Sequence, residues 1–247
     1  MVKQAFLERL KSGVPMLGDG AMGTLLHNRG GLAVNTCFEA LNLEDSDLVY
    51  SVHCDYVRAG SDLIETNTFG ANRYRLAEPG LSDQVDAINR AAVAIAQRAA
   101  SECSQRPIYI AGSVGPLGVQ LRPYGRLTHD EAQQAFTEQM RALAEAGVDL
   151  FQLETFTNHD ELLIALKAAR QVAPQLPVIA HATFNRDGVT YTGANPARVA
   201  SDLYQAGADV IGVNCGSGPA DISQILHIMR KAVPEAHFSA MPNAGFP

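Results

Sequence analysis

Residues 207–219 read GADVIGVNCGSGP, and this stretch decides the fold class. Within it, Val210–Val213 is a short apolar run of the kind that forms a buried strand, and it leads into a Gly-rich turn that holds Cys215. Two earlier stretches have the same pattern, GSDLIETNT at 60–68 and GVDLFQLET at 147–155. In each of them a Gly ends a helical pattern, an Asp follows two residues later, and an apolar run ends in polar residues. We interpret all three as buried strands that follow helices.

Polar residues stand at the same place in these three stretches. Five residues on from each Asp lie Asn67, Glu154 and Asn214, and Cys215 follows Asn214 directly. The carboxyl ends of parallel strands meet at one edge of a sheet, and folds of this kind bind their ligands there. The sequence therefore predicts a site that contains a cysteine, a carboxylate and amides.

Strands and helices alternate along the chain, which indicates an α/β fold with parallel strands and right-handed crossovers. The seven predicted strands are Val14–Leu17, Leu63–Ile64, Ile108–Ala111, Leu150–Leu153, Val178–Thr183, Val210–Val213 and Phe238–Met241. A doubly wound open sheet is one way to build this pattern. Polar residues follow several strands alike, however, which favours a ring over a single switch point. We predict a TIM-type (β/α)8 barrel, one domain over residues 1–247, with only about seven strands in this chain and the last βα unit missing.

Local signals mark the helix boundaries. Ser46 is expected to cap a helix that runs to Ala59 and stops at Gly60. A capping box at 128–131 opens another helix, and the sequence at 158–161 has the same form. Asn195 followed by proline opens a further one.

The composition excludes several classes of protein. A net charge of −7 with no basic cluster argues against a nucleic-acid partner or an anionic membrane surface. No apolar run has the roughly 18 residues that a membrane span needs, and the N-terminal stretch 1–11 reads as an amphipathic helix rather than a signal peptide. The four cysteines show no CxxC spacing, so we expect a reduced, cytoplasmic protein. They are Cys37, Cys54, Cys103 and Cys215.

Two features carry more than one interpretation. Cys215 is an inert core residue, a nucleophile or a metal ligand; its place in a Gly-rich turn favours a functional role, but no base for a nucleophile can be identified. The turn GDGAMGT at 18–24 is either a strand-to-helix connection or a surface on which Asp19 and backbone N–H groups face a ligand. A phosphate loop is disfavoured because no Gly-Lys-Ser/Thr follows and Asp19 would repel an anion.

Six motifs together resemble the homocysteine S-methyltransferase family, in particular the homocysteine-binding barrel of cobalamin-dependent methionine synthases and of bifunctional forms fused to a methylenetetrahydrofolate reductase. In chain order they are GDGAMGT at 18–24, IETNTF at 64–69, GSVGP at 112–116, LET at 153–155, GVNC at 212–215 and PNAG at 242–245. The resemblance runs from about Val14 to the last residue.

The resemblance implies a barrel in which three cysteine thiolates hold Zn²⁺ and homocysteine sulfur takes the fourth position, so that methyl transfer gives methionine. Cys215 matches the first of these ligands, and Glu154 matches the carboxylate that would hold the substrate ammonium. The residues expected to bind homocysteine are Asp19, Gly20, Ala21, Asn67, Glu154 and Asn214. The resemblance leaves the methyl donor open among methylcobalamin, a methylated folate acting through it, S-methylmethionine and a betaine.

One departure from the family's pattern is large. The other two family ligands lie in a Gly-Gly-Cys-Cys-Gly motif on the eighth strand, and this chain ends before it. His181 is a conceivable substitute ligand, although a hydrogen-bonded core histidine is the commoner outcome. We favour a truncated, zinc-poor form of the methyltransferase barrel over a non-catalytic, barrel-like amino-acid-binding protein. A phosphate-binding barrel synthase is a weaker third hypothesis.

Overall fold

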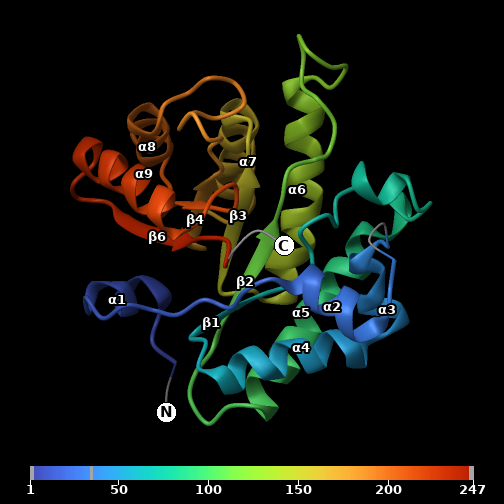
Figure 1. The fold of residues 1–247 in the computed structure, drawn as a ribbon. Coiled ribbons are helices and arrows are strands. Elements are labelled where there is room, and N and C mark those ends of the chain that lie inside the picture. Colours follow the sequence, from blue (N-terminus) through green and yellow to red (C-terminus); the bar gives the residue numbers. More distant parts are fainter. Residues whose placement is uncertain (1–2, 34–35, 245–247) are drawn as a thin grey trace. The chain divides into compact units, whose positions relative to one another are not determined.

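The computed structural model describes residues 3–33 and 36–244. The contacts divide the chain into two compact units, one running up to Val114 and including Glu138–Leu150, the other made of Gly115–Thr137 and the residues from Phe151 onward. Each unit is built from helices and parallel strands, which confirms the predicted α/β class (Figure 1). That the chain forms one domain stays a prediction. None of the described helices combines the length and the apolar character needed to cross a membrane.

The first unit holds a pair of parallel strands with helices around it. Strand β1 (Leu63–Glu65) pairs with β2 (Tyr109–Val114), with Ile64 opposite Ile110. The helices wholly within this unit are α1 (Phe6–Lys11), α2 (Met22–Gly30), α3 (Leu41–Glu44), α4 (Ser46–Ala59) and α5 (Val85–Glu102), with short 3-10 turns at Phe38–Ala40, Arg75–Ala77 and Ser82–Gln84. Apolar side chains from these helices form one buried cluster, made of Leu26, Leu41, Val49, Val52 and Ile95.

The second unit holds four parallel strands whose order in the sheet follows the chain. Strands β3 (Leu150–Phe156), β4 (Val178–Ala182), β5 (Val210–Asn214) and β6 (His237–Met241) alternate with helices α7 (His159–Val172), α8 (Pro196–Gln205) and α9 (Pro219–Ala232). Helices α8 and α9 pack side by side (Figure 1). The residues of helix α6 (His129–Ala146) are divided between the units, with 129–137 in the second and 138–146 in the first.

Most of the predicted helix signals are confirmed. Asn158 accepts hydrogen bonds from the N–H groups of two residues in the first turn of α7, and Asn195 accepts one from Arg198 N–H with Pro196 at the start of α8. Gly60 ends α4 with a φ of 113°, in the left-handed region that favours glycine. The predicted cap Ser46 is wrong by one residue: Asp45 accepts the capping bond from Leu48 N–H, at 3.2 Å.

The predicted first strand, Val14–Leu17, is not a regular strand. The chain is extended enough there for the Leu17 carbonyl to accept bonds from the N–H groups of Asp62 and Leu63, at 2.7 and 3.2 Å. Pro15 has no N–H to donate, and the side chains of Val14 and Leu17 are both 58% exposed rather than buried. Six of the seven predicted strands are therefore confirmed among the described residues. The predicted N-terminal helix begins at Phe6, and Met1 and Val2 lie outside the described residues.

The expectation of four reduced cysteines is wrong for two of them. Cys54 on α4 and Cys103 at the end of α5 form a disulfide, while Cys37 and Cys215 are free. The physical reason is that α4 and α5 pack against each other and bring the two Cα atoms to 5.5 Å, within the usual range for a disulfide.

Candidate functional site

Cys215 lies immediately after β5 in a backbone conformation that non-glycine residues rarely adopt. Its φ is 55°, and its N–H donates to the Met241 carbonyl at the end of β6, at 3.1 Å. Gly216 follows with a φ of 71°, and a Cβ there would lie 2.7 Å from the Phe184 carbonyl oxygen. The glycine after Cys215 is thus required both by its dihedral angle and by the close backbone.

The end of β3 meets this turn through a side-chain network. Thr155 also has a positive φ, 62°, at an irregularity in the pairing of β3 with β4. The N–H of Thr155 donates to Asn214 Oδ1, and Asn214 Nδ2 donates to Thr155 Oγ1, both at 2.8 Å. The Cys215 Sγ atom lies 3.6 Å from each of Thr155 Oγ1 and Asn214 Nδ2. The structure therefore places Asn214 and Cys215, which are neighbours in the chain, beside Thr155 and the predicted Glu154 at the end of β3.

Two threonines of this network were not among the predicted site residues. Thr155 is one, and Thr183, whose hydroxyl donates to the Asn214 carbonyl at 2.9 Å, is the other. A signal for Thr155 does exist in the sequence, since it follows Glu154 as Cys215 follows Asn214. Thr183 has no comparable signal, because its role depends on the packing of β4 beside β5.

Burial raises the pKa of the Cys215 thiol; the hydrogen bond with Thr155 lowers it, and the nearby Glu154 carboxylate raises it further. The thiol is therefore protonated at neutral pH. A cation close to the sulfur is needed to favour the thiolate, which is the form that binds metals and attacks electrophiles. Glu154 supplies a negative charge in the same place, so this part of the second unit can attract a metal ion or an ammonium group.

The described residues do not fit a complete zinc site. Among residues 3–33 and 36–244 no group of three or more His, Cys, Asp or Glu side chains could hold a metal ion. A structural or catalytic zinc site needs at least three protein ligands. Cys215 is the only cysteine among the described residues of the second unit, and Cys37, Cys54 and Cys103 belong to the first unit.

His181 on β4 is fully buried, and neither of its ring nitrogens has a hydrogen-bond partner in the described part of the chain. Burial lowers its pKa to about 4, so the ring is neutral at physiological pH. Its Cδ2 atom would lie 2.8 Å from a Cβ at Gly212, so only a glycine on β5 leaves room for the ring. The expectation that a core histidine here is hydrogen-bonded is wrong. No metal-ligand cluster includes His181 among the described residues.

The remaining predicted residues lie in the first unit. Asp19 Oδ2 accepts a hydrogen bond from Glu65 N–H at the end of β1, at 2.9 Å. The hydroxyl of Tyr56 on α4 donates to the Ala21 carbonyl at 3.1 Å, and a Cβ at Gly20 would lie 3.0 Å from that hydroxyl oxygen. The turn at 18–24 is thus attached to the end of β1 and to α4. This fixes the positions of Asp19, Gly20 and Ala21 within the unit.

Asn67 is buried, and its amide group serves the local structure. Its Nδ2 atom donates to the Phe38 carbonyl at 2.7 Å and to Asn42 Oδ1 at 3.1 Å. Asn42 returns a bond of 2.8 Å to the Asn67 carbonyl. These bonds hold the segment after β1 against the 3-10 turn at Phe38–Ala40. A role for Asn67 in ligand binding stays a prediction.

Comparison with known proteins places the chain in a family. A family model described as Homocysteine S-methyltransferase matches residues 16–247. Methionine synthase of Mycobacterium tuberculosis (strain ATCC 25618 / H37Rv) is 34% identical over 247 residues, which cover 94% of this chain and 20% of that protein. S-methylmethionine–homocysteine S-methyltransferase BHMT2 of Rattus norvegicus is 29% identical over 239 residues, covering 97% of this chain and 62% of that protein. The chain thus spans about a fifth of the first relative and less than two thirds of the second.

The crystal structure of the homocysteine methyltransferase MmuM from Escherichia coli in its metallated form has a TM-score of 0.84 to this chain at 25% identity, covering 97% of this chain and 87% of that one. Its oxidized form gives 0.78 at 26% identity, covering 93% and 82%. These matches confirm both the resemblance seen in the six motifs and the TIM-type α/β fold, of which six strands are described here.

Proposed function

Because this chain belongs to the homocysteine S-methyltransferase family, we propose that it binds homocysteine and promotes transfer of a methyl group to the homocysteine sulfur, which gives methionine. The observation that carries the proposal is the arrangement of Cys215, Asn214 and Thr155 at the ends of β5 and β3, in a turn whose backbone is held in a rare conformation. Positive φ values at non-glycine residues persist where the surroundings hold them, and they concentrate at functional sites.

In the proposed reaction, the homocysteine sulfur attacks the methyl carbon of a donor, the S–C bond forms as the bond to the leaving group breaks, and the thiol proton is lost. A free thiol has a pKa of about 8.5 and is mostly protonated at neutral pH, so a cation at the sulfur would raise the fraction of thiolate. Glu154 is proposed to hold the substrate ammonium by a charge-assisted hydrogen bond. Asp19, Gly20 and Ala21 are proposed to bind the amino-acid end of homocysteine, and Asn67 and Asn214 to form hydrogen bonds at the rim of the site.

We further propose that the activity depends on zinc and that Cys215 supplies one thiolate ligand. The described residues do not complete such a site, so two further ligands are required in addition to Cys215. Bound there, Zn²⁺ would supply Lewis-acid chemistry that lowers the pKa of the homocysteine thiol. We place the protein in the cytoplasm, where thiol ligands stay reduced.

The role of Glu154 is tested by Glu154→Gln in the full-length protein. The uncharged amide keeps the shape of the side chain and removes the ion pair, so homocysteine should bind roughly 10-fold more weakly or worse, as expected for loss of a charge-assisted bond. Isothermal titration with homocysteine measures this. Glu235→Gln, an exposed carboxylate in the same unit, is the matched control. Unchanged affinity in Glu154→Gln would exclude the proposed ammonium contact.

Zinc stoichiometry tests the metal proposal and separates it from the alternative function. The full-length protein is dialysed with and without homocysteine, and its zinc is measured together with methionine formation from S-methylmethionine and from methylcobalamin. Retained zinc that is lost in Cys215→Ser supports the proposal. Homocysteine binding without zinc and without methyl transfer from either donor would instead indicate a non-catalytic amino-acid-binding protein.

A further inference from the structure

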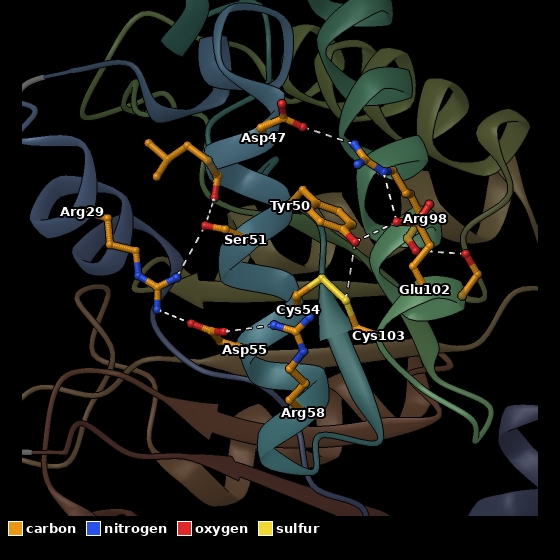
Figure 2. Close-up of a disulfide and its surroundings, with 12 residues drawn as sticks. Arg29, Asp47, Tyr50, Ser51, Cys54, Asp55, Arg58, Arg98, Glu102 and Cys103 are labelled. Carbon is orange, nitrogen blue, oxygen red and sulfur yellow. Dashed lines mark hydrogen bonds and ion pairs between the residues drawn. A yellow bond between two sulfur atoms is a disulfide. The ribbon is translucent and has the colours of Figure 1, made fainter.

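A disulfide joins Cys54 and Cys103 in the first unit (Figure 2). It includes neither the proposed metal ligand Cys215 nor any residue proposed to bind the substrate. Cys54 is in the middle of α4 and is 2% exposed, whereas Cys103 follows the last residue of α5 and is half-buried. Cys103 is therefore the more accessible residue of the pair, and Cys54 is covered by protein. Because of this difference in exposure, Cys103 should react with a small disulfide first and Cys54 second.

The side chains beside Cys103 suit a free thiol as well as a disulfide (Figure 2). The Tyr50 hydroxyl donates its single proton to Glu102 Oε2, at 2.7 Å, and its oxygen lies 3.6 Å from Cys103 Sγ. In the disulfide state neither atom of that second contact has a proton to share. After reduction the Cys103 thiol gains one, and the Tyr50 oxygen can accept it. The guanidinium of Arg98 lies 4.0 Å from the centre of the Tyr50 ring and keeps the phenol in place.

The two helices are also held together by contacts that do not depend on the disulfide. Val49 and Val52 of α4 share a buried apolar cluster with Ile95 of α5. Arg98 of α5 forms an ion pair with Asp47 of α4, at 3.3 Å. Breaking the sulfur–sulfur bond should therefore leave α4 and α5 packed, and the thiols should stay close enough to pair again.

From these three observations we propose that Cys54 and Cys103 form a reversible thiol–disulfide site that exchanges with low-molecular-weight disulfides such as oxidised glutathione. In the forward direction, the Cys103 thiolate attacks one sulfur of the small disulfide, forms a mixed disulfide and releases one thiolate. The Cys54 thiolate then attacks the Cys103 sulfur, forms the intramolecular bond and releases the second thiolate. Two cysteine sulfurs are oxidised and one small disulfide is reduced to two thiols, so the reaction is balanced.

The oxidised state closes a covalent loop with a sequence separation of 49. That loop contains β1 and Asn67, and it begins and ends on the helices that flank them. Oxidation therefore adds a covalent restraint to this segment of the first unit, and reduction removes that restraint. In a reducing compartment such as the proposed cytoplasm, the dithiol is the resting state. The fold keeps the two sulfurs close enough to form the disulfide when conditions become more oxidising.

The test is a redox titration of the native full-length protein in mixtures of reduced and oxidised glutathione. Samples are quenched in acid, free thiols are alkylated, and peptides are mapped by mass spectrometry. The linked Cys54–Cys103 peptide should appear and disappear reversibly as the glutathione ratio changes. Cys54→Val removes the thiolate that attacks the mixed disulfide, so a glutathione adduct should accumulate on Cys103. In Cys103→Ala the buried Cys54 should stay unmodified.

Cys37 is the internal control. Burial, with the Glu39 carboxylate adding to it, raises the pKa of its thiol to about 11, so its thiolate is scarce and it should carry little glutathione under the same conditions. Two results would overturn the proposal: cysteines that stay linked in native protein under excess reduced glutathione, or thiols that never link under excess oxidised glutathione. The titration of the unsubstituted protein decides this even where Cys54→Val fails to fold.

Discussion

Both units hold polar residues at the end of a strand, but they do so by different means. In the first unit the Asp19 carboxylate binds the backbone at the end of β1, and a disulfide joins α4 and α5, the helices that precede and follow that strand in the chain. In the second unit Asn214 binds Thr155 through two hydrogen bonds, and the non-glycine backbone at Thr155 and Cys215 has positive φ. The first region is therefore stabilised by a bond that reductants can remove. The second is stabilised by buried side-chain hydrogen bonds.

The largest expected effect is removal of the covalent link from the first region. Cross-linking residues with a sequence separation of 49 reduces the entropy of the unfolded chain. In the chain-entropy model this corresponds to about 4 kcal/mol of stability at 25 °C. We expect Cys54→Val, or reduction of the unsubstituted protein, to lower the free energy of unfolding by up to that amount, as measured by urea unfolding followed by circular dichroism.

The control for this prediction is Cys37→Ala, which removes a free thiol from the same unit and should show the same dependence on reductant as the unsubstituted protein. A free energy of unfolding that is equal with and without reductant would mean that noncovalent contacts alone hold α4 against α5. The contrast between the two regions would then disappear.

A second effect compares one buried histidine from each region. His53 on α4 and His181 on β4 are fully buried, and burial lowers the pKa of each to about 4 from an ordinary value of 6.5. In the unfolded chain they bind protons below pH 6.5, whereas in the folded chain they do so only below about pH 4. The contribution of the neutral histidines to the free energy of unfolding is therefore complete above pH 6.5. It decreases as the pH drops from 6.5 to 4, by about 3 kcal/mol for each histidine.

Urea unfolding measured across this pH range tests the prediction. His53→Leu and His181→Leu should each remove about half of the slope of unfolding free energy against pH that the two histidines cause. Each variant leaves the histidine of the other region as an internal control. A slope that neither substitution changes would show that other groups cause the acid sensitivity. A pH dependence lost in only one variant would mean that this one histidine causes the acid sensitivity.

A third effect concerns the turn after Cys215. A Cβ at Gly216 would lie 2.7 Å from the Phe184 carbonyl oxygen and 2.9 Å from Thr183 Cγ2, and the φ of 71° is unfavourable for any side chain. Gly216→Ala should cost about 3 kcal/mol, because overpacking and backbone strain act together. Gly188 has a φ of 73° but open space around it, so Gly188→Ala should cost about 1 kcal/mol. Equal losses of thermal stability in the two variants would show that the turn yields to the new side chain.

Features that depend on neighbouring residues were predictable from the sequence. Asn158 and Asn195 cap helices as expected, because a capping side chain bonds to N–H groups two or three residues away. The position of Cys215 at a strand end was predictable for the same reason, since a run of apolar residues before a Gly-rich turn is a local pattern.

Features that depend on packing were not predictable. The pairing of Cys54 with Cys103 requires α4 to meet the end of α5, and no spacing rule indicates that meeting. The positive φ of Thr155 contradicts the ordinary preference of a β-branched residue, and it is held by Asn214 from another strand. The first predicted strand is wrong because an apolar run does not reveal that Val14 and Leu17 face solvent.

The last and smallest effect tests whether Asn214 holds the second region together. Asn214→Ala removes the acceptor of Thr155 N–H and the donor to Thr155 Oγ1, and an unpaired buried group costs about 2 kcal/mol. Asn28→Ala, at an exposed position on α2, is the matched control and should change stability little. The loss of stability alone does not separate this network from ordinary core packing, but the reactivity of Cys215 does. Asn214 Nδ2 lies 3.6 Å from its sulfur, so Asn214→Ala should also change the rate at which Cys215 is alkylated in the folded protein. If stability falls while that rate stays the same, Asn214 supports β3 and β5 without positioning the cysteine, and the strained turn must position Cys215 by itself.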